Sequence, residues 1–242
     1  MMVAFIISVV FGFIMIPVLK KLNVKQTLIV LLEKKHHDKY GTPTMGGLIF
    51  IIPTIISTII LILMNKLSYT SNLFIIMFVF VAYALLGFID DYLIIKRHNN
   101  IGLTEKQKLF GQILIAVIFF YIFMRSGRST VLDIHTLGIR IDLGWGYGLL
   151  ILFLLVASSN AVNITDGLDG LAGGLSTIAF LAFGIISFGS YWIQGSEDIG
   201  VFCFILVGSL LGFLPFNFNP AKIFMGDTGS NFIGFVLSVI SI

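Results

Sequence analysis

Long stretches of apolar residues dominate the pattern of this chain. They cover residues 3–19, 45–64, 73–94, 109–124, 147–163, 171–192, 199–216 and 229–242. Most approach or reach the roughly 20 residues that an α-helix needs to cross about 30 Å of hydrocarbon. The strands of a membrane barrel would instead alternate apolar and polar residues over short segments. We therefore predict an all-α polytopic membrane protein with about eight transmembrane helices, in which residues 1–242 form a single domain.

Two segments depart from this pattern. The last apolar stretch, residues 229–242, reaches only about 21 Å at 1.5 Å per residue, so we expect the chain to be truncated at its C-terminus. The polar segment 130–143 contains TVLDI and IRIDL on either side of HTLG. Short β-type runs around a turn predict a small β-hairpin.

The composition and the distribution of charge set the orientation. The chain is 57% hydrophobic and 11% charged, far below the roughly 25% charged residues of a soluble domain; we expect a membrane environment and no nucleic-acid partner. Lysine and arginine concentrate in alternate loops, namely at Lys20, Lys21, Lys25, Lys34, Lys35, Lys39, Lys96, Arg97, Lys106, Lys108 and Lys222. Positive charge stays on the cytoplasmic side, which places the N-terminus and the hairpin outside.

Five aspartates lie at the inner ends of the predicted helices. Asp90 and Asp91 come near the end of the third apolar stretch, Asp166 and Asp169 follow the fifth, and Asp227 precedes the eighth. Carboxylates at membrane depth are costly and usually mark function. A purely structural role remains open for each group. Asp90 and Asp91 could form ion pairs with Lys96 and Arg97, Asp166 and Asp169 could cap helices in a glycine-rich contact, and Asp227 could be a helix cap alone.

Three segments with special backbone or capping residues accompany these acids. In GTPTMGG, residues 41–47, Thr42 is placed to cap the second helix and Pro43 to occupy its first turn. In FMGDTGS, residues 224–230, Asp227 could cap the eighth helix, whose free N–H groups favour phosphate. In residues 160–174, NAVNITDGLDGLAGG, we expect Gly173 and Gly174 to serve helix packing.

Acids, nearby lysines and helix N-termini on one face favour an anionic substrate and Mg²⁺, which prefers a few carboxylates together with substrate phosphates. Phosphoryl transfer with a metal clamp uses such parts. The lysines could instead serve only the general charge bias of the inner loops. An ion-coupled transporter is the rival class, but transporters place their charges near the bilayer midplane rather than at one end.

At these residues the chain closely resembles the polyprenyl-phosphate N-acetylhexosamine-1-phosphate transferase superfamily. The resemblance rests on five ordered blocks: GTPTMGG, FIDDY, GLTEKQK, NAVNITDGLDGLAGG and FNFNPAKIFMGDTGS. Within the superfamily, the first and fourth blocks look most like the phospho-N-acetylmuramoyl-pentapeptide transferases. That resemblance implies Mg²⁺-dependent transfer of phospho-MurNAc-pentapeptide from UDP to undecaprenyl phosphate with release of UMP, the first membrane step of peptidoglycan synthesis. It places the active site on the cytoplasmic face of the bacterial plasma membrane and leaves a homodimer open.

The resemblance also assigns roles to residues. It implies that Asp90 and Asp91 are paired catalytic acids, with Asp90 accepting a proton from the lipid phosphate or orienting it. Asp227 would be a catalytic residue and the principal Mg²⁺ ligand. The matching substrate-binding positions are Lys39, Thr44, Lys108, Asn163, Asp166, Asp169, Asn217, Phe224 and Gly226.

Some features keep alternatives open. The block NFNPAKIFMGDTGSNFIGF reads more like the sister enzymes that transfer GlcNAc-1-phosphate from UDP-N-acetylglucosamine to undecaprenyl phosphate. The family usually has lysine three residues after the second acid, where this chain has Ile94, with Lys96 the nearest lysine. The family has ten spans, with a histidine-rich inner loop before the last. A truncated, inactive relative is therefore a third alternative.

Overall fold

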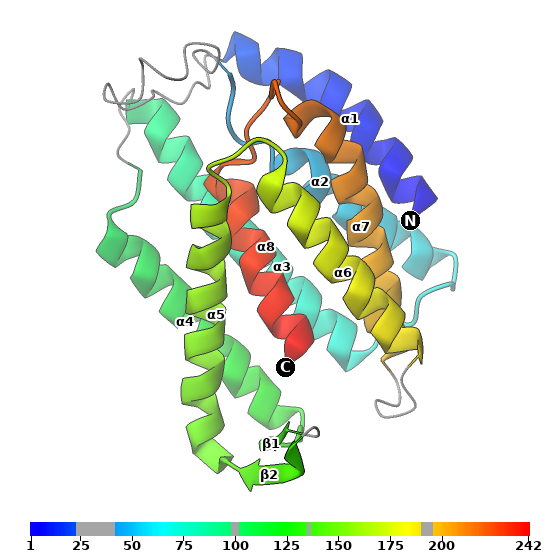
Figure 1. The fold of residues 1–242 in the computed structure, drawn as a ribbon, viewed down its shortest axis with the longest axis vertical. Helices are drawn as coiled ribbons and strands as arrows, with labels where there is room; N and C mark the ends of the chain where they lie inside the picture. The colour runs from blue at the N-terminus through cyan, green and yellow to red at the C-terminus, as the bar shows by residue number, and fades with distance from the viewer. Residues whose placement is uncertain (23–41, 98–101, 135–136, 190–195) are drawn as a thin grey trace.

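The computed structural model describes residues 1–22, 42–97, 102–134, 137–189 and 196–242. These residues form eight α-helices and one β-hairpin (Figure 1). In chain order the elements are α1 (Met2–Lys21), α2 (Leu48–Leu63), α3 (Ser71–Arg97), α4 (Glu105–Arg125), β1 (Val131–Ile134), β2 (Ile139–Asp142), η3 (Gly144–Gly146), α5 (Tyr147–Thr165), α6 (Leu171–Gly189), α7 (Glu197–Asn217) and α8 (Gly226–Ser241). Each predicted apolar stretch corresponds to one helix, so the predicted all-α membrane fold is confirmed.

The helices differ in whether they are long enough to cross a bilayer. Within the described ranges, six apolar segments have the length and hydropathy of membrane spans: α1, α3, α4, residues 144–165, α6 and α7. The two remaining helices, α2 and α8, have 16 residues each, about 24 Å at 1.5 Å per residue. The chain is thus a polytopic membrane protein, whereas the orientation inferred from its charges stays a prediction.

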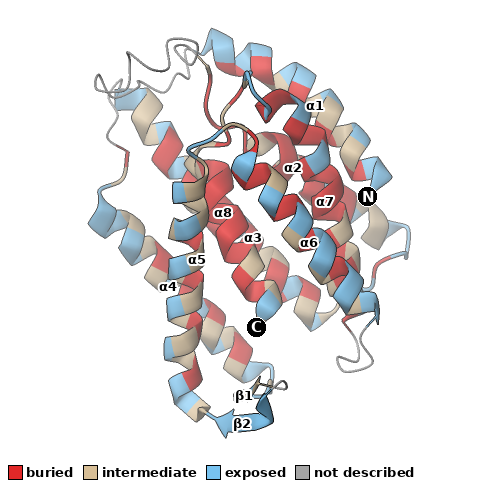
Figure 2. Ribbon diagram, viewed as in Figure 1, coloured by how far each residue is buried: buried red, intermediate tan, exposed pale blue. Residues whose placement is uncertain are grey.

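Helix α8 lies at the centre of the bundle. It packs against α3 and α5 and more lightly against α6 and α2, and most of its residues from Thr228 to Val239 are buried (Figure 2). Small residues permit this position, because a Cβ atom at Gly234 would overlap the carbonyl group of Ser158 on α5. The outer helices expose large apolar side chains such as Phe13 and Leu149, as expected for surfaces that face lipid.

The predicted hairpin is confirmed. Strands β1 and β2 are antiparallel, with Val131 opposite Asp142 and Ile134 opposite Ile139. The hairpin joins α4 to α5 at the end of the bundle opposite the turns that connect α5 to α6 and α7 to α8 (Figure 1). The molecule therefore has one end with a hairpin and another where several helix termini and connections converge.

Two sequence blocks meet at this second end, although they lie far apart in the chain. The N–H groups of Gly46 and Gly47 donate to the carbonyl oxygens of Phe224 and Met225 at 2.8 Å, and Phe224 N–H donates to Pro43 at 2.8 Å. The expectation that Thr42 caps α2 is wrong, because α2 begins at Leu48 without a side-chain cap. Pro43, Gly46 and Gly47, which precede α2, instead pair through their backbones with Phe224 and Met225 before α8.

Candidate active site

The end of the bundle that lacks the hairpin gathers the predicted acids around one lysine. The Lys108 ammonium, on the first turn of α4, lies 2.6 Å from Asp227 Oδ2 and 3.3 Å from Asp90 Oδ2. The carboxylates of Asp90 and Asp227 are also close enough to interact with each other. The other oxygen of Asp90 accepts a hydrogen bond from Leu103 N–H at 2.6 Å. Three helices, α3, α4 and α8, thus contribute one charged group each to a single cluster.

Asn163 completes the cluster from α5. Its side-chain amide donates to Asp227 Oδ1 at 2.6 Å and to Ser230 Oγ at 2.8 Å. Both oxygens of Asp227 are therefore held, one by an ammonium and one by an amide. Ser230 was not predicted as a site residue, although it follows Asp227 by three positions in the same motif and so lies on the same side of the helix.

Asp91 has a different role from its neighbour in this structure. Asp91 is 3% exposed, and its carboxylate accepts hydrogen bonds from Thr228 N–H at 2.8 Å, Thr228 Oγ1–H at 2.5 Å and Asp227 N–H at 3.2 Å. The expectation that Asp227 caps α8 is wrong, since Asp91 satisfies the first N–H groups of that helix from α3. Capping by a neighbouring helix leaves the Asp227 side chain free to face Lys108 and Asn163.

Asp166 lies beside this cluster in the turn after α5. Its carboxylate accepts a hydrogen bond from Gly226 N–H. Burial, followed by the nearby carboxylates of Asp227 and Asp91, raises the pKa of Asp166 to about 8. A carboxyl group in such a field of negative charge is neutral near pH 7 unless a cation offsets that field.

Asp169 and Asn217 tie two connections together. Asp169 Oδ2 accepts hydrogen bonds from Asn219 Nδ2 at 3.1 Å and Ala221 N–H at 3.3 Å. Asn217 accepts from Gly170 N–H at 3.1 Å and donates to the Ile223 carbonyl at 3.0 Å. These contacts fix the turn after α5 against the segment between α7 and α8. These hydrogen bonds of the two predicted residues are with the backbone and Asn219, and the charge of Asp169 also acts on Asp166.

The remaining predicted positions shape the backbone next to the acids. Gly226 has φ +74°, and a Cβ atom there would lie 2.6 Å from Thr44 Oγ1 and 2.7 Å from Asp91 Oδ2. Buried Thr44 and the backbone of Phe224 thus line the same corner. Lys39, the other predicted substrate-binding residue, lies outside the described residues.

This chain has Ile94 where the family usually has lysine, but a lysine from another helix lies beside Asp90. Lys96 is exposed near the end of α3, whereas the ammonium beside Asp90 belongs to Lys108 on α4. The spacing within the DDYLIIK segment therefore does not decide which cation faces the acid. Tertiary packing brings in Lys108, which the third sequence block contributes.

The donor set is suitable for a magnesium ion shared with a substrate. Within the described ranges, no three His, Cys, Asp or Glu side chains form a metal-binding group by themselves. The carboxylates of Asp90 and Asp227 both contact the Lys108 ammonium. Magnesium is commonly held by one or two carboxylates together with substrate phosphates and water. These two aspartates fit that pattern.

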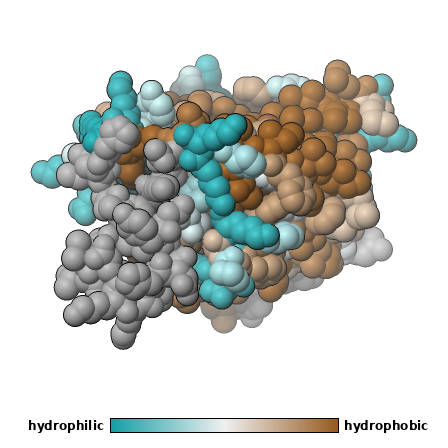
Figure 3. All heavy atoms as spheres, turned by 90° about the horizontal axis from the view of Figure 1, so that it is seen from above, coloured by the Kyte–Doolittle hydropathy of each residue, from teal (hydrophilic) through white to brown (hydrophobic). Residues whose placement is uncertain are grey.

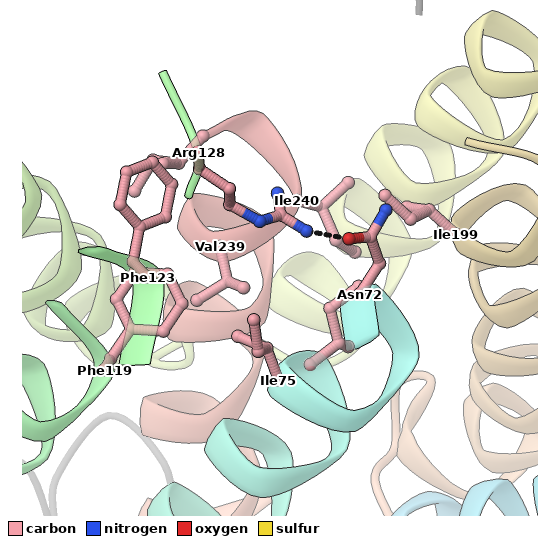
Figure 4. A pocket seen from close by; sticks show the side chains of 10 residues that line it. Asn72, Ile75, Phe119, Phe123, Arg128, Ile199, Val239 and Ile240 are labelled. Atoms are coloured by element: carbon pink, nitrogen blue, oxygen red, sulfur yellow. Dashed lines mark hydrogen bonds between the residues drawn. The ribbon is translucent and has the colours of Figure 1, made fainter. Parts of the chain in front are cut away.

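The far end of the bundle holds a separate cavity of about 40 Å³. Figure 4 shows its mostly apolar lining, with the Arg128 guanidinium donating a hydrogen bond to Asn72. The guanidinium also lies 5.8 Å from the centre of the Phe123 ring. Asn72 and Asp90 are separated by about 27 Å along α3 at 1.5 Å per residue. This cavity is therefore distinct from the acidic cluster.

The cluster lies at the end of the bundle where α3 ends and α4 and α8 begin. Seen from above the view of Figure 1, hydrophilic groups lie beside hydrophobic surface (Figure 3). A polytopic helical membrane protein with lysine, asparagine and carboxylates gathered at one end has the parts of a membrane-embedded phosphotransferase. Comparison with known proteins narrows this class to one family.

Residues 72–242 match the model of glycosyl transferase family 4, and residues 39–51 match signature 1 of phospho-N-acetylmuramoyl-pentapeptide-transferase. A protein of that name from Geobacillus thermodenitrificans is 44% identical over 242 residues, which cover 100% of this chain and 73% of the relative. One from Anoxybacillus flavithermus is 46% identical over 241 residues, covering 99% and 72%. The chain belongs to glycosyl transferase family 4. It is a phosphoglycosyl transferase, and the predicted resemblance is confirmed.

Proposed function

We propose that this protein transfers phospho-MurNAc-pentapeptide from UDP to undecaprenyl phosphate and releases UMP, in a Mg²⁺-dependent reaction at the cytoplasmic face of the bacterial plasma membrane. This reaction is the first membrane step of peptidoglycan synthesis. The names of the relatives support the choice of sugar. The observation that carries the proposal is the contact of Lys108 with both Asp90 and Asp227, while Asn163 holds the other oxygen of Asp227.

The arrangement suggests a division of labour among these residues. Asp227 would hold Mg²⁺ jointly with the substrate, and the ion would neutralise charge on the diphosphate of the UDP-sugar. Lys108 supplies a second positive charge between the two acids. Asp90, fixed by Leu103 N–H, is placed to accept a proton from the lipid phosphate or to orient it. Phosphoryl transfer depends mainly on such positioning and charge stabilisation.

The location of the cluster suits two substrates of different solubility. The nucleotide sugar is soluble in water, whereas the polyprenyl chain of the acceptor stays in the hydrocarbon. Asp90 and Lys108 lie near the ends of the apolar helices α3 and α4, which face lipid with side chains such as Tyr92 and Phe110. A site at this depth can meet both substrates without drawing either fully into the other phase.

The proposal is tested by replacing Asp227 with asparagine, which keeps the shape of the side chain and removes its charge. We expect UMP release from UDP-MurNAc-pentapeptide to fall on the order of 100- to 1,000-fold, because the Mg²⁺ that stabilises charge in the transition state would lose its carboxylate ligand. The assay measures labelled UMP with undecaprenyl phosphate as acceptor, with and without Mg²⁺. Asp198→Asn, the same change in the first turn of α7 at the other end of the bundle, is the matched control.

Each alternative gives a different result in this assay. Wild-type UMP release from UDP-N-acetylglucosamine but not from the muramoyl substrate would assign the protein to the sister activity. Undetectable turnover with every UDP-sugar would favour an inactive relative. Full UMP release by Asp227→Asn, or wild-type release that is indifferent to Mg²⁺, would contradict the metal role of Asp227.

A further inference from the structure

The three helices that enclose Asp227 also meet one helical turn deeper in the bundle. Lys108, Asn163 and Asp227 lie on α4, α5 and α8 and contact one another at the site. Four positions further into the bundle, each of these helices carries a polar side chain that is almost fully buried: Gln112, Ser159 and Asn231, which we call the polar layer. Because four residues are about one helical turn, the polar layer repeats the arrangement of the site directly beneath it.

A directed chain of hydrogen bonds connects the polar layer. The Gln112 side-chain amide donates to Ser159 Oγ at 3.2 Å, and the Ser159 hydroxyl donates to Asn231 Oδ1 at 3.2 Å. Asn231 Nδ2 in turn donates to the Asp227 carbonyl oxygen at 3.1 Å. A hydroxyl can accept one hydrogen bond while donating another. Ser159 therefore links a donor on α4 to an acceptor on α8, and the chain ends on the backbone of the residue that forms the centre of the site.

Neighbouring groups fix the orientation of Gln112. Asn160 Nδ2 donates to Gln112 Oε1 at 3.2 Å, and the Tyr83 hydroxyl, on α3, donates to the Gln112 main-chain carbonyl at 2.9 Å. Gln112, Ser159 and Asn231 are 1%, 0% and 1% exposed, and none of their buried side-chain nitrogen and oxygen atoms is without a partner. The polar layer is therefore fully satisfied and has a defined arrangement.

Apolar side chains could fill this space without the cost of burying amides in a membrane interior. Apolar contacts, however, are non-directional, so they tolerate small rotations or shifts of one helix along another. The hydrogen bonds of the polar layer hold only at one register and rotation of α4, α5 and α8. The two 2.6 Å contacts of Asp227 with Lys108 and Asn163 require that same register.

We propose that Gln112, Ser159 and Asn231 are positioning residues, which set the register of α4, α5 and α8 so that Lys108 and Asn163 meet Asp227. They touch neither substrate nor metal in this scheme and act through the three residues above them. The inference rests on the proposed transfer reaction for its kinetic test, and it also predicts a geometric effect that needs no turnover.

The kinetic test compares two identical substitutions at buried serines. Ser159→Ala breaks the chain of the polar layer. Ser209→Ala removes a buried hydroxyl that accepts a 2.9 Å hydrogen bond from Thr54 between α7 and α2, and Ser209 is also 0% exposed. We expect Ser159→Ala to lower kcat on the order of 10- to 100-fold relative to Ser209→Ala, because small misplacements of catalytic groups are costly. The thermal midpoints of the two variants in detergent should be similar.

A second variant tests whether the polar layer acts as a unit. Gln112→Met keeps the length of the side chain and removes the hydrogen bond to Ser159. Since both substitutions break the same chain, the double variant Gln112→Met, Ser159→Ala should lose little more kcat than the more affected single variant. Losses that multiply would mean that the two residues act separately, and they would overturn the proposal.

The geometric test uses spin labels on Lys106→Cys and Ile164→Cys, two exposed positions beside the site on α4 and α5. The distance distribution between them should broaden in Ser159→Ala and stay unchanged in Ser209→Ala. The proposal is overturned if the distributions match, or if the kcat values of the two alanine variants agree within about twofold. Absence of UMP release from the wild type would defeat the proposed function instead, and the spin-label distances would then decide the inference alone.

Discussion

Two adjacent aspartates, Asp90 and Asp91, have different surroundings. Successive helical residues point about 100° apart, and here this rotation aims Asp90 at Lys108 and Asp91 at the first turn of α8. Asp91 satisfies three donors, so its contacts support the helix that carries Asp227. Asp90 has a cation and one backbone N–H as partners.

Replacing Asp91 with alanine should therefore affect folding as well as activity. The variant leaves two N–H groups and the Thr228 hydroxyl without their acceptor, which costs about 1–3 kcal/mol of unfolding free energy. We expect the thermal midpoint in detergent, followed by protein fluorescence, to fall more in Asp91→Ala than in Asp90→Ala. Both variants should lose UMP release. Equal midpoints for the two variants would show that the Asp91 contacts do not hold α8.

Asp166 gives the fold a dependence on pH. Its pKa of about 8 in the folded protein exceeds the value near 3.9 of an unfolded aspartate, so the folded state binds the proton more tightly. The contribution of Asp166 to the free energy of unfolding is therefore largest below about pH 4, and it declines as the pH rises to about 8. The thermal midpoint of Asp166→Asn, relative to wild type without divalent cations, should rise between these values and then level off. A difference independent of pH would contradict the raised pKa.

The sequence blocks identified these residues, but the partners of each side chain could not be predicted from sequence. Asp227 precedes an apolar stretch, which is the position of a helix cap, and Asp91 is separated from it by more than a hundred residues. Only the packed structure shows that Asp91 makes that cap and that Asp227 contacts Lys108. Such contacts depend on the rotation of each helix, which a hydropathy pattern constrains weakly.

At the level of helices, a close approach of α3 and α8 sets the position of Asp227. A Cβ atom at Gly87 would overlap the Asp227 carbonyl oxygen. By contrast, no atom of the described residues lies within 4 Å of a Cβ built on Gly174, so the expectation that Gly174 serves packing against them is wrong. Gly173 does pack, since its Cβ would lie 3.0 Å from Leu214.

Gly87→Ala should separate these two helices. We expect a loss of about 1–3 kcal/mol in unfolding free energy from overpacking, together with a lower rate of UMP release because Asp227 moves. Gly174→Ala, also in a helix, is the control, and it should be neutral or stabilising by up to about 1 kcal/mol. Unchanged activity in Gly87→Ala would mean that the α3–α8 contact does not position the site.

The helices themselves were largely predictable, because long apolar runs have few alternatives in a membrane. The start of α2 was not. Residues 42–47 contain threonine and proline in a capping order, yet they pair with the chain before α8. Backbone pairing between distant segments leaves no local signature, so sequence reasoning places these residues in the nearest helix.

For the whole molecule, the acidic cluster and the hairpin lie at opposite ends (Figure 1). The predicted orientation can be tested with Ser129→Cys, next to the hairpin, and Lys106→Cys, next to the cluster. In intact cells, a maleimide that cannot cross the membrane should label the first variant and reach the second only after lysis. The native thiol, Cys203, is buried and should react with neither protocol. Labelling of Lys106→Cys in intact cells would reverse the orientation.

The central position of α8 could not be anticipated from composition. Its first half, GDTGSNFIG, is richer in small and polar residues than the other helices. Such a segment would suit the water-facing end of a bundle as well as its interior. The closely packed neighbours, including Gly87 and Gly234, make this sequence suitable for the middle of the bundle. The arrangement is a property of all the helices together.

This position has a consequence for how the protein is made. The N-terminal part of a chain is synthesised first, and among the described residues α8 follows seven other α-helices. Until α8 inserts, Asp91 lacks the Thr228 donors and Ser159 lacks its acceptor on Asn231. The helices made before α8 must therefore tolerate these unsatisfied polar groups, and the bundle reaches its stable packing only when its central helix inserts.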